Sequence, residues 1–236
     1  MRQTAHLRFG GILFSSLDQA DFTGPFEVLG CVPNSTFHVL AKTKRPVRDV
    51  KGLVLTPDKT LAQCPQLDLL LIPGGAGVNA LMEDETVLAF IRSQATRARI
   101  ILSVCTGALV CGAAGLLMGR KATTHWASHH LLKHFGATPV NQRVVRDGNL
   151  VTCAGVTAGI DGALQAVALL RGRRAAEAIQ LYLEYAPDPP FAVGTPSTAP
   201  RGLVRAGRAA LGVLLEERAV IIRRVARKLG ITGNHG

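Results

Sequence analysis

Short apolar runs alternate along the chain with stretches in which apolar residues recur every three to four positions. The runs predict buried strands near residues 7–14, 36–41, 53–56, 67–72 and 100–104. The helical spacing predicts helices near residues 25–31, 88–96, 107–119, 125–134, 159–170 and 175–185. This alternation is typical of a mainly parallel sheet covered by helices on both faces, so we predict an α/β fold.

Turn-forming residues organise the second half of the chain. Asp147, Gly148 and Asn149 separate two apolar runs, which predicts an antiparallel hairpin of 140–145 with 150–153. Prolines at 187–190 and 196–200 predict that a packed domain of residues 1–195 ends there. We expect residues 196–236 to form a linker and one basic amphipathic helix, near 203–229, that packs on the domain or on a second copy of the chain.

The composition indicates a compact globular protein, because 47% of the residues are hydrophobic and 18% are charged. Residues 100–119 carry no charge and resemble a membrane span, but Ser103, Thr106 and four glycines divide them into a strand, a tight turn and a helix. We therefore expect no membrane segment. Acidic residues follow the first apolar run directly, so we expect no signal peptide, and the odd count of five cysteines favours the cytoplasm.

The net charge of +11 raises nucleic acid as a candidate partner. More than half of that excess lies in residues 201–228, which carry eight basic and two acidic side chains. This segment stands apart from the motifs that carry chemistry, so we expect no nucleic-acid partner. Its arginines are expected to be solvated.

The most informative motif is Ser103-Val104-Cys105-Thr106-Gly107, where a strand runs into a helix of small residues with a thiol at the junction. Such a sharp turn resembles the nucleophile elbow of hydrolases. We expect the positive end of the helix dipole to favour the thiolate of Cys105, and the amide of Thr106 to face negative charge on a substrate. The other four cysteines are expected to be buried bystanders.

Two further strand ends complete the candidate site. Gly74 and Gly75 follow the strand near 67–72, where glycine allows backbone amides to approach a substrate closely. Asp21 follows the first strand, just before Pro25, which predicts the start of a helix with Thr23 or Gly24 as its cap. Because the carboxyl ends of parallel strands meet at one edge of a sheet, these residues are expected to lie together.

Four segments in this order resemble the DJ-1/PfpI superfamily: residues 21–29, 73–77, 103–107 and 122–126. The similarity covers about residues 7–192. It implies a flavodoxin-like three-layer sandwich, a homodimer and no cofactor, with Cys105 as nucleophile, Asp21 as acid/base, and Thr106 with Gly75 around the reacting atom. Among members, the chain resembles most those that hydrate an isonitrile to an N-substituted formamide, with Asp21 acting first as acid and then as base.

Several alternatives stay open. Related proteases, deglycases and glyoxalases often place a histidine after the cysteine, where this chain has Thr106. AraC-type regulators share these motifs but add a DNA-binding part, for which the residues after the linker are too few. A non-catalytic ligand sensor and a redox sensor remain. His125, His129, His130 and His134 form two i,i+4 pairs without a local third ligand, so we expect no metal. Cys153-Ala154 departs from the glycine-rich run expected near the site.

Overall fold

A computed structural model describes residues 5–231 of the chain. Its centre is a seven-stranded sheet in the order β10-β11-β7-β6-β1-β2-β5, parallel except for the β10–β11 hairpin. The strands are β1 (Leu7–Ile12), β2 (Ser35–Ala41), β5 (Lys59–Thr60), β6 (Leu69–Ile72), β7 (Ile100–Val104), β10 (Val144–Asp147) and β11 (Leu150–Cys153). Every residue of β6, β7 and β11 is buried, as expected for strands covered on both faces.

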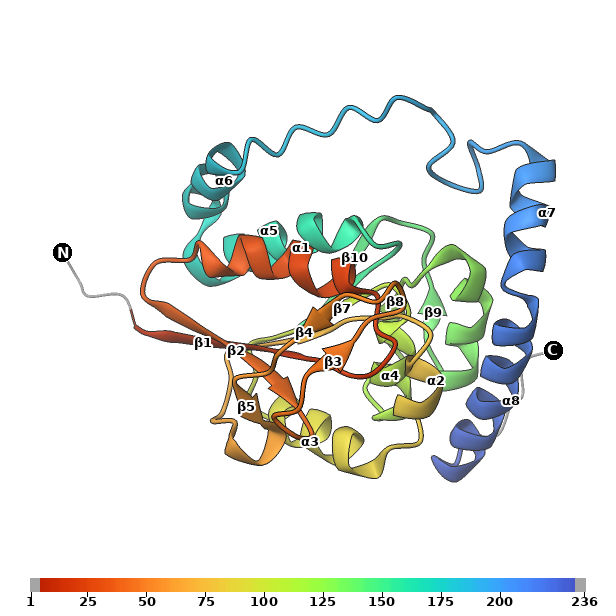
Figure 1. Ribbon diagram of the computed structural model, residues 1–236, viewed down its shortest axis with the longest axis horizontal. Helices are drawn as coiled ribbons and strands as arrows, with labels where there is room; N and C mark the ends of the chain where they lie inside the picture. The colour runs from red at the N-terminus through yellow and green to blue at the C-terminus, as the bar shows by residue number, and fades with distance from the viewer. Residues whose placement is uncertain (1–4, 232–236) are drawn as a thin grey trace.

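Helices cover both faces of this sheet (Figure 1). One layer contains α1 (Gln19–Gly30) and α5 (Ala158–Arg171), which pack on each other, and the other contains α3 (Glu85–Ala95) and α4 (Gly107–Ala113). The remaining elements are β3 (Val47–Arg48), β4 (Val54–Leu55), η1 (Leu61–Gln63), α2 (Val78–Leu81), β8 (Lys121–Ala122), η2 (Trp126–Phe135), β9 (Thr138–Pro139) and α6 (Arg173–Tyr182). The predicted α/β three-layer architecture is confirmed.

Helix α1 begins earlier than the sequence predicts. Asp18 is its cap, accepting a hydrogen bond from the Ala20 amide at 3.2 Å, so Pro25 lies inside the helix rather than at its start. Proline cannot donate to the carbonyl four residues before it, which disfavours this position locally. Tertiary packing compensates: Pro25 lies so close to α5 that a Cβ added at Gly159 would be 2.9 Å from its Cγ.

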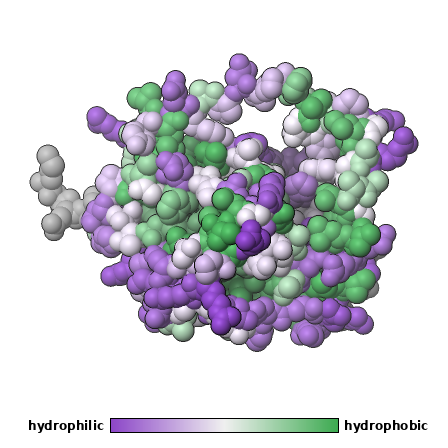
Figure 2. Space-filling view, viewed as in Figure 1, coloured by the Kyte–Doolittle hydropathy of each residue, from purple (hydrophilic) through white to green (hydrophobic). Residues whose placement is uncertain are grey.

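The basic tail forms two helices, α7 (Arg201–Ala210) and α8 (Gly212–Lys228), where the sequence predicts one. The break falls at Leu211, before Gly212. Helix α7 buries no residue, whereas α8 packs against η2, α2 and α4 and buries Ile221, Ile222 and Val225. Between α6 and α7 the chain stands away from the body and leaves a hollow beneath it (Figures 1 and 2).

Among residues 5–231, no helix is both long and apolar enough to cross a membrane.

Candidate active site

Cys105 occupies a strained turn between β7 and α4. Its φ of 54° lies in the left-handed region, which a residue with a side chain rarely adopts and which costs on the order of 1–3 kcal/mol. Two hydrogen bonds hold the turn: the Cys105 amide donates to the Cys153 carbonyl at 3.0 Å, and the Thr124 hydroxyl donates to the Cys105 carbonyl at 2.7 Å. At Gly107 any Cβ would lie 2.1 Å from the Ile72 carbonyl oxygen, so only glycine lets α4 start this close to β6.

The Gly74–Gly75 loop connects the other predicted site residues. The Gly74 amide donates to Oδ2 of Asp21 at 2.9 Å, and the Gly75 amide donates to the Thr106 hydroxyl at 3.0 Å. Gly75 has a φ of 130°, which favours glycine. Both amides are therefore engaged by protein groups, where the sequence analysis expected them to bind substrate. Thr106 supplies the amide that faces the Cys105 sulfur.

Gly74 lies against two of the predicted site residues, Thr106 and Asp21. A Cβ at Gly74 would lie 2.6 Å from the Thr106 nitrogen, 2.7 Å from its hydroxyl oxygen and 2.8 Å from Oδ2 of Asp21. The absence of a side chain at Gly74 thus lets this loop pack directly against the Thr106 amide and the Asp21 carboxyl group. An amide donor and an acid/base carboxyl group that both act on the Cys105 sulfur can serve one reaction.

Asp21 titrates near neutral pH. Burial of its carboxyl and the negative charge of Asp18 raise its pKa to about 7, against the lowering effects of the Gly74 hydrogen bond and of Cys105. The side chain is fully buried, and its Oδ1 atom makes no hydrogen bond to the described part of the protein. Asp21 can therefore give or take a proton at physiological pH.

Burial and the helix terminus act on the Cys105 thiol in opposite directions. Burial raises its pKa most, and the negative charge of Asp21 adds to that increase. The Thr106 amide and the positive charge of Arg218 lower the pKa, as the sequence analysis expects of a helix terminus. The net shift is upward, so the surroundings of Cys105 oppose the thiolate that the helix terminus favours.

Sequence reasoning missed Arg218 of α8, which lies beside this site. It is 3% exposed and donates to the Gly75 carbonyl at 3.3 Å. A signal was present: Arg218 is three and four residues before Ile221 and Ile222, on the apolar stripe of its helix. A cation at a buried position of an amphipathic helix indicates a partner inside the protein.

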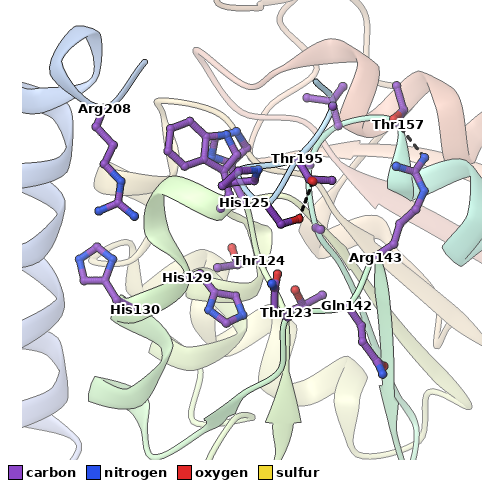
Figure 3. A pocket seen from close by; sticks show the side chains of 18 residues that line it. Thr123, Thr124, His125, His129, His130, Gln142, Arg143, Thr157, Thr195 and Arg208 are labelled. Atoms are coloured by element: carbon purple, nitrogen blue, oxygen red, sulfur yellow. Dashed lines mark hydrogen bonds between the residues drawn. The ribbon is translucent and has the colours of Figure 1, made fainter. Parts of the chain in front are cut away.

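A cavity of about 700 Å³ opens on the other side of Thr124 (Figure 3). Histidines from η2 and Arg208 from α7 line one side, and Arg143 and Thr157, joined by a hydrogen bond, line another (Figure 3). His125 caps η2, and this element is a 3₁₀-helix, in which i,i+4 residues do not share a face. In residues 5–231 no three histidine, cysteine or acidic side chains cluster as metal ligands would.

Comparison with known proteins gives three informative relatives. Isonitrile hydratase of Pseudomonas putida is 52% identical over 225 residues, which are 95% of this chain and 99% of the relative. A crystal structure of a ThiJ/PfpI family protein from Pseudomonas syringae superposes with a TM-score of 0.90 and 38% identity, covering 93% of this chain and 91% of the other. The HTH-type transcriptional regulator GbdR of Pseudomonas aeruginosa is 31% identical over 61% of this chain but only 39% of its own length.

The family model described as the DJ-1/PfpI family matches residues 12–169, which include Asp21, the Gly74–Gly75 loop and the Cys105 elbow. The match spans more than half of the chain, and the flavodoxin-like sheet order agrees with it. The chain belongs to the DJ-1/PfpI family.

Proposed function

We propose that this protein adds water to an isonitrile and releases an N-substituted formamide. The observation that carries the proposal is the 52% identity to isonitrile hydratase of Pseudomonas putida over 99% of that enzyme, together with a thiol, a carboxyl group and an amide in one buried site. The terminal carbon of an isonitrile accepts a nucleophile and a proton on the same atom. Cys105 and Asp21 supply this pair.

In the first half-reaction, Asp21 acts as a base. Its pKa of about 7 lies below that of the Cys105 thiol, so above neutral pH the carboxylate faces a protonated thiol. The carboxylate takes the thiol proton, the sulfur bonds to the isonitrile carbon, and the same proton passes from Asp21 to that carbon. The product is a covalent thioimidate, R–N=CH–S–Cys105, and the Asp21 carboxylate is restored. Asp21 thus receives the thiol proton before it acts as the acid toward the isonitrile carbon, which is the first role that the sequence analysis expects.

In the second half-reaction, water releases the product. The Asp21 carboxylate takes a proton from water, the hydroxide oxygen bonds to the thioimidate carbon, and the proton moves to nitrogen. The carbon–sulfur bond then breaks, the hydroxyl proton returns to sulfur through Asp21, and the formamide R–NH–CHO leaves. The Thr106 amide faces the sulfur throughout and stabilises negative charge there.

A direct assay tests this function. Purified full-length protein is incubated with a simple alkyl isonitrile, and formamide is measured by chromatography with mass detection. We expect turnover by the wild type and by Cys64→Ala, a matched loss of a thiol elsewhere, and none above background by Cys105→Ala. Asp21→Asn should accumulate less formamide by at least a hundredfold, since general acid–base catalysis contributes roughly 10²–10⁴-fold. No formamide from the wild type, or full turnover by Cys105→Ala, would refute the proposal.

The redox-sensor alternative is less well supported. Sensor cysteines are exposed and have a low pKa, because the thiolate is the form that oxidants attack. Cys105 is 7% exposed and burial raises its pKa. The regulator alternative lacks support from the tail, because α8 packs on the body of the protein rather than forming a separate unit.

We also propose that the protein is a cytoplasmic homodimer. All five cysteines are free, which suits a reducing compartment. Large apolar side chains project from α6 and the segment after it, with Leu181 83%, Tyr182 76% and Phe191 74% exposed. A second copy of the chain would cover such a surface. Light scattering coupled to size-exclusion chromatography tests the dimer, and a mass of one chain at micromolar concentration would contradict it.

A further inference from the structure

Arg218 is the one buried lysine or arginine among residues 5–231, although the tail that contains it is the most basic part of the chain. The other seven basic side chains of residues 201–228 are exposed: Arg201, Arg205, Arg208, Arg223, Arg224, Arg227 and Lys228. Burying a cation removes its hydration, so the protein must compensate it with charge or hydrogen bonds.

Neutral groups from three elements compensate Arg218. Its Nε donates to Oδ1 of Asn79 at 2.8 Å, its Nη1 to the Ser128 hydroxyl at 3.0 Å and its Nη2 to the Gly75 carbonyl at 3.3 Å. No carboxylate in the described part of the chain forms an ion pair with it. Three hydrogen bonds hold the guanidinium in place, and no counter-charge neutralises it. Its positive charge can therefore stabilise negative charge that forms nearby.

The negative charge nearby is that of the reactive site. The Gly75 carbonyl that accepts from Arg218 also accepts from the Thr106 hydroxyl at 3.3 Å, and the adjacent Gly74 amide holds Asp21. Arg218 and Cys105 act on each other electrostatically. Arg218 lowers the pKa of the Cys105 thiol, and Cys105 raises the pKa of Arg218. Burial lowers the pKa of Arg218 by more than Cys105 raises it. Glu217, the other charge that acts on Arg218, belongs to the same helix.

We propose that Arg218 is a positioning residue of this site, whose guanidinium holds Gly75 and with it Thr106, and whose charge stabilises the anionic sulfur of Cys105 in both half-reactions. The basic tail thereby completes the site from outside residues 12–169, which the family model matches. The expected effect of Arg218 on the rate of isonitrile hydration rests on the proposed function. Its expected effect on the stability of the Cys105 thiolate does not.

Two variants separate charge from geometry. Arg218→Gln removes the charge. Arg218→Lys keeps the charge, but a lysine ammonium lacks the planar arrangement of donors with which the guanidinium binds three acceptors. Arg223→Gln is the matched control, since it removes one charge from an exposed position of the same helix. The rate at which iodoacetamide alkylates Cys105 is measured from pH 6 to 10.5 by mass spectrometry of the peptide that contains it, and thermal unfolding checks that each variant is folded.

We expect Arg218→Gln to alkylate about tenfold more slowly than wild type at pH 8, because the thiolate loses a nearby positive charge. Arg218→Lys and Arg223→Gln should follow the wild-type profile. In isonitrile hydration, both Arg218 variants should lose at least tenfold in kcat with little change in KM, because Arg218 does not touch the substrate. A folded Arg218→Gln with wild-type alkylation overturns the proposal.

If Arg218→Gln does not fold, Arg218→Lys decides the question. A wild-type kcat in Arg218→Lys overturns the positioning role. A tenfold loss of kcat in Arg218→Lys with an unchanged alkylation profile supports it. If the wild type itself hydrates no isonitrile, the proposed function fails, and the alkylation profiles still decide the role of Arg218.

Discussion

Replacing Gly74 by alanine places a methyl group against Thr106 and Asp21. The new Cβ would lie 2.6 Å and 2.7 Å from the nitrogen and hydroxyl oxygen of Thr106, and 2.8 Å from Oδ2 of Asp21. Since ordinary contact begins near 3.4 Å, these atoms must retreat by about 0.6 to 0.8 Å. None of them is the free end of a long side chain, so Asp21, Thr106 and the loop must move together.

Such a displacement has a calculable effect on catalysis. A misplacement of about 1 Å at a reacting centre costs roughly 10²-fold in rate, which equals about 2.7 kcal/mol of transition-state stabilisation. We therefore expect kcat/KM for an alkyl isonitrile to fall by about 10²-fold in Gly74→Ala. The free energy of unfolding should fall by about 1–3 kcal/mol, the usual cost of overpacking.

The pH profile provides a second measurement on the same variant. The Gly74 hydrogen bond lowers the pKa of Asp21, so its displacement should raise that pKa above about 7 and move the acidic limb of kcat/KM to higher pH. Gly202→Ala in α7 is the control, because nothing lies within 4 Å of the added Cβ. A folded Gly74→Ala whose kcat/KM is within about threefold of wild type would refute the role of Gly74 in positioning Asp21 and Thr106 for the reaction.

Three further predictions test other parts of the structure. Because the Asp21 carboxylate must accept the thiol proton, kcat/KM should fall about tenfold per pH unit below its pKa of about 7, and a flat profile between pH 5 and 7 would contradict this role. Thr106→Val leaves the Gly75 amide without its acceptor, which costs about 1–3 kcal/mol and should lower kcat by roughly 5- to 100-fold, whereas Thr106→Ser should stay close to wild type. Ile222→Ala should lower the free energy of urea unfolding by about 2–5 kcal/mol, because this side chain of α8 is fully buried against the body of the protein. Val213→Ala, at an 84% exposed position of the same helix, should change it by less than about 0.5 kcal/mol, and equal midpoints for the two variants would contradict the packing of α8.

Local signals located the elements on which the site is built. Runs of mostly apolar residues identified β6 and β7, because strands buried on both faces are predominantly apolar; Ser103 is the one polar residue in these two strands. Cys105, two residues before Gly107, identified the elbow. Glycine is required at 107 because only glycine allows α4 to begin against the Ile72 carbonyl. These features depend on neighbours in the chain, so the sequence contains them.

Long-range packing decided where local rules failed. Pro25 marks a helix start by its own chemistry, yet α1 continues through it because α1 packs against α5. The apolar stripe of the tail predicted one helix and did not distinguish packing on the body from packing on a second copy.

The sequence by itself determined which segments form the central strands and the presence of Cys105, Asp21 and Thr106 at strand or helix ends. Only the tertiary structure decided the order of the strands, how Asp21 and Cys105 titrate and which cation accompanies them. The pKa values of Asp21 and Cys105 depend on burial and on each other's charge, and Arg218 reaches Gly75 from 143 positions further along the chain. Desolvation and charge act through space, and no local pattern encodes the distances over which they act.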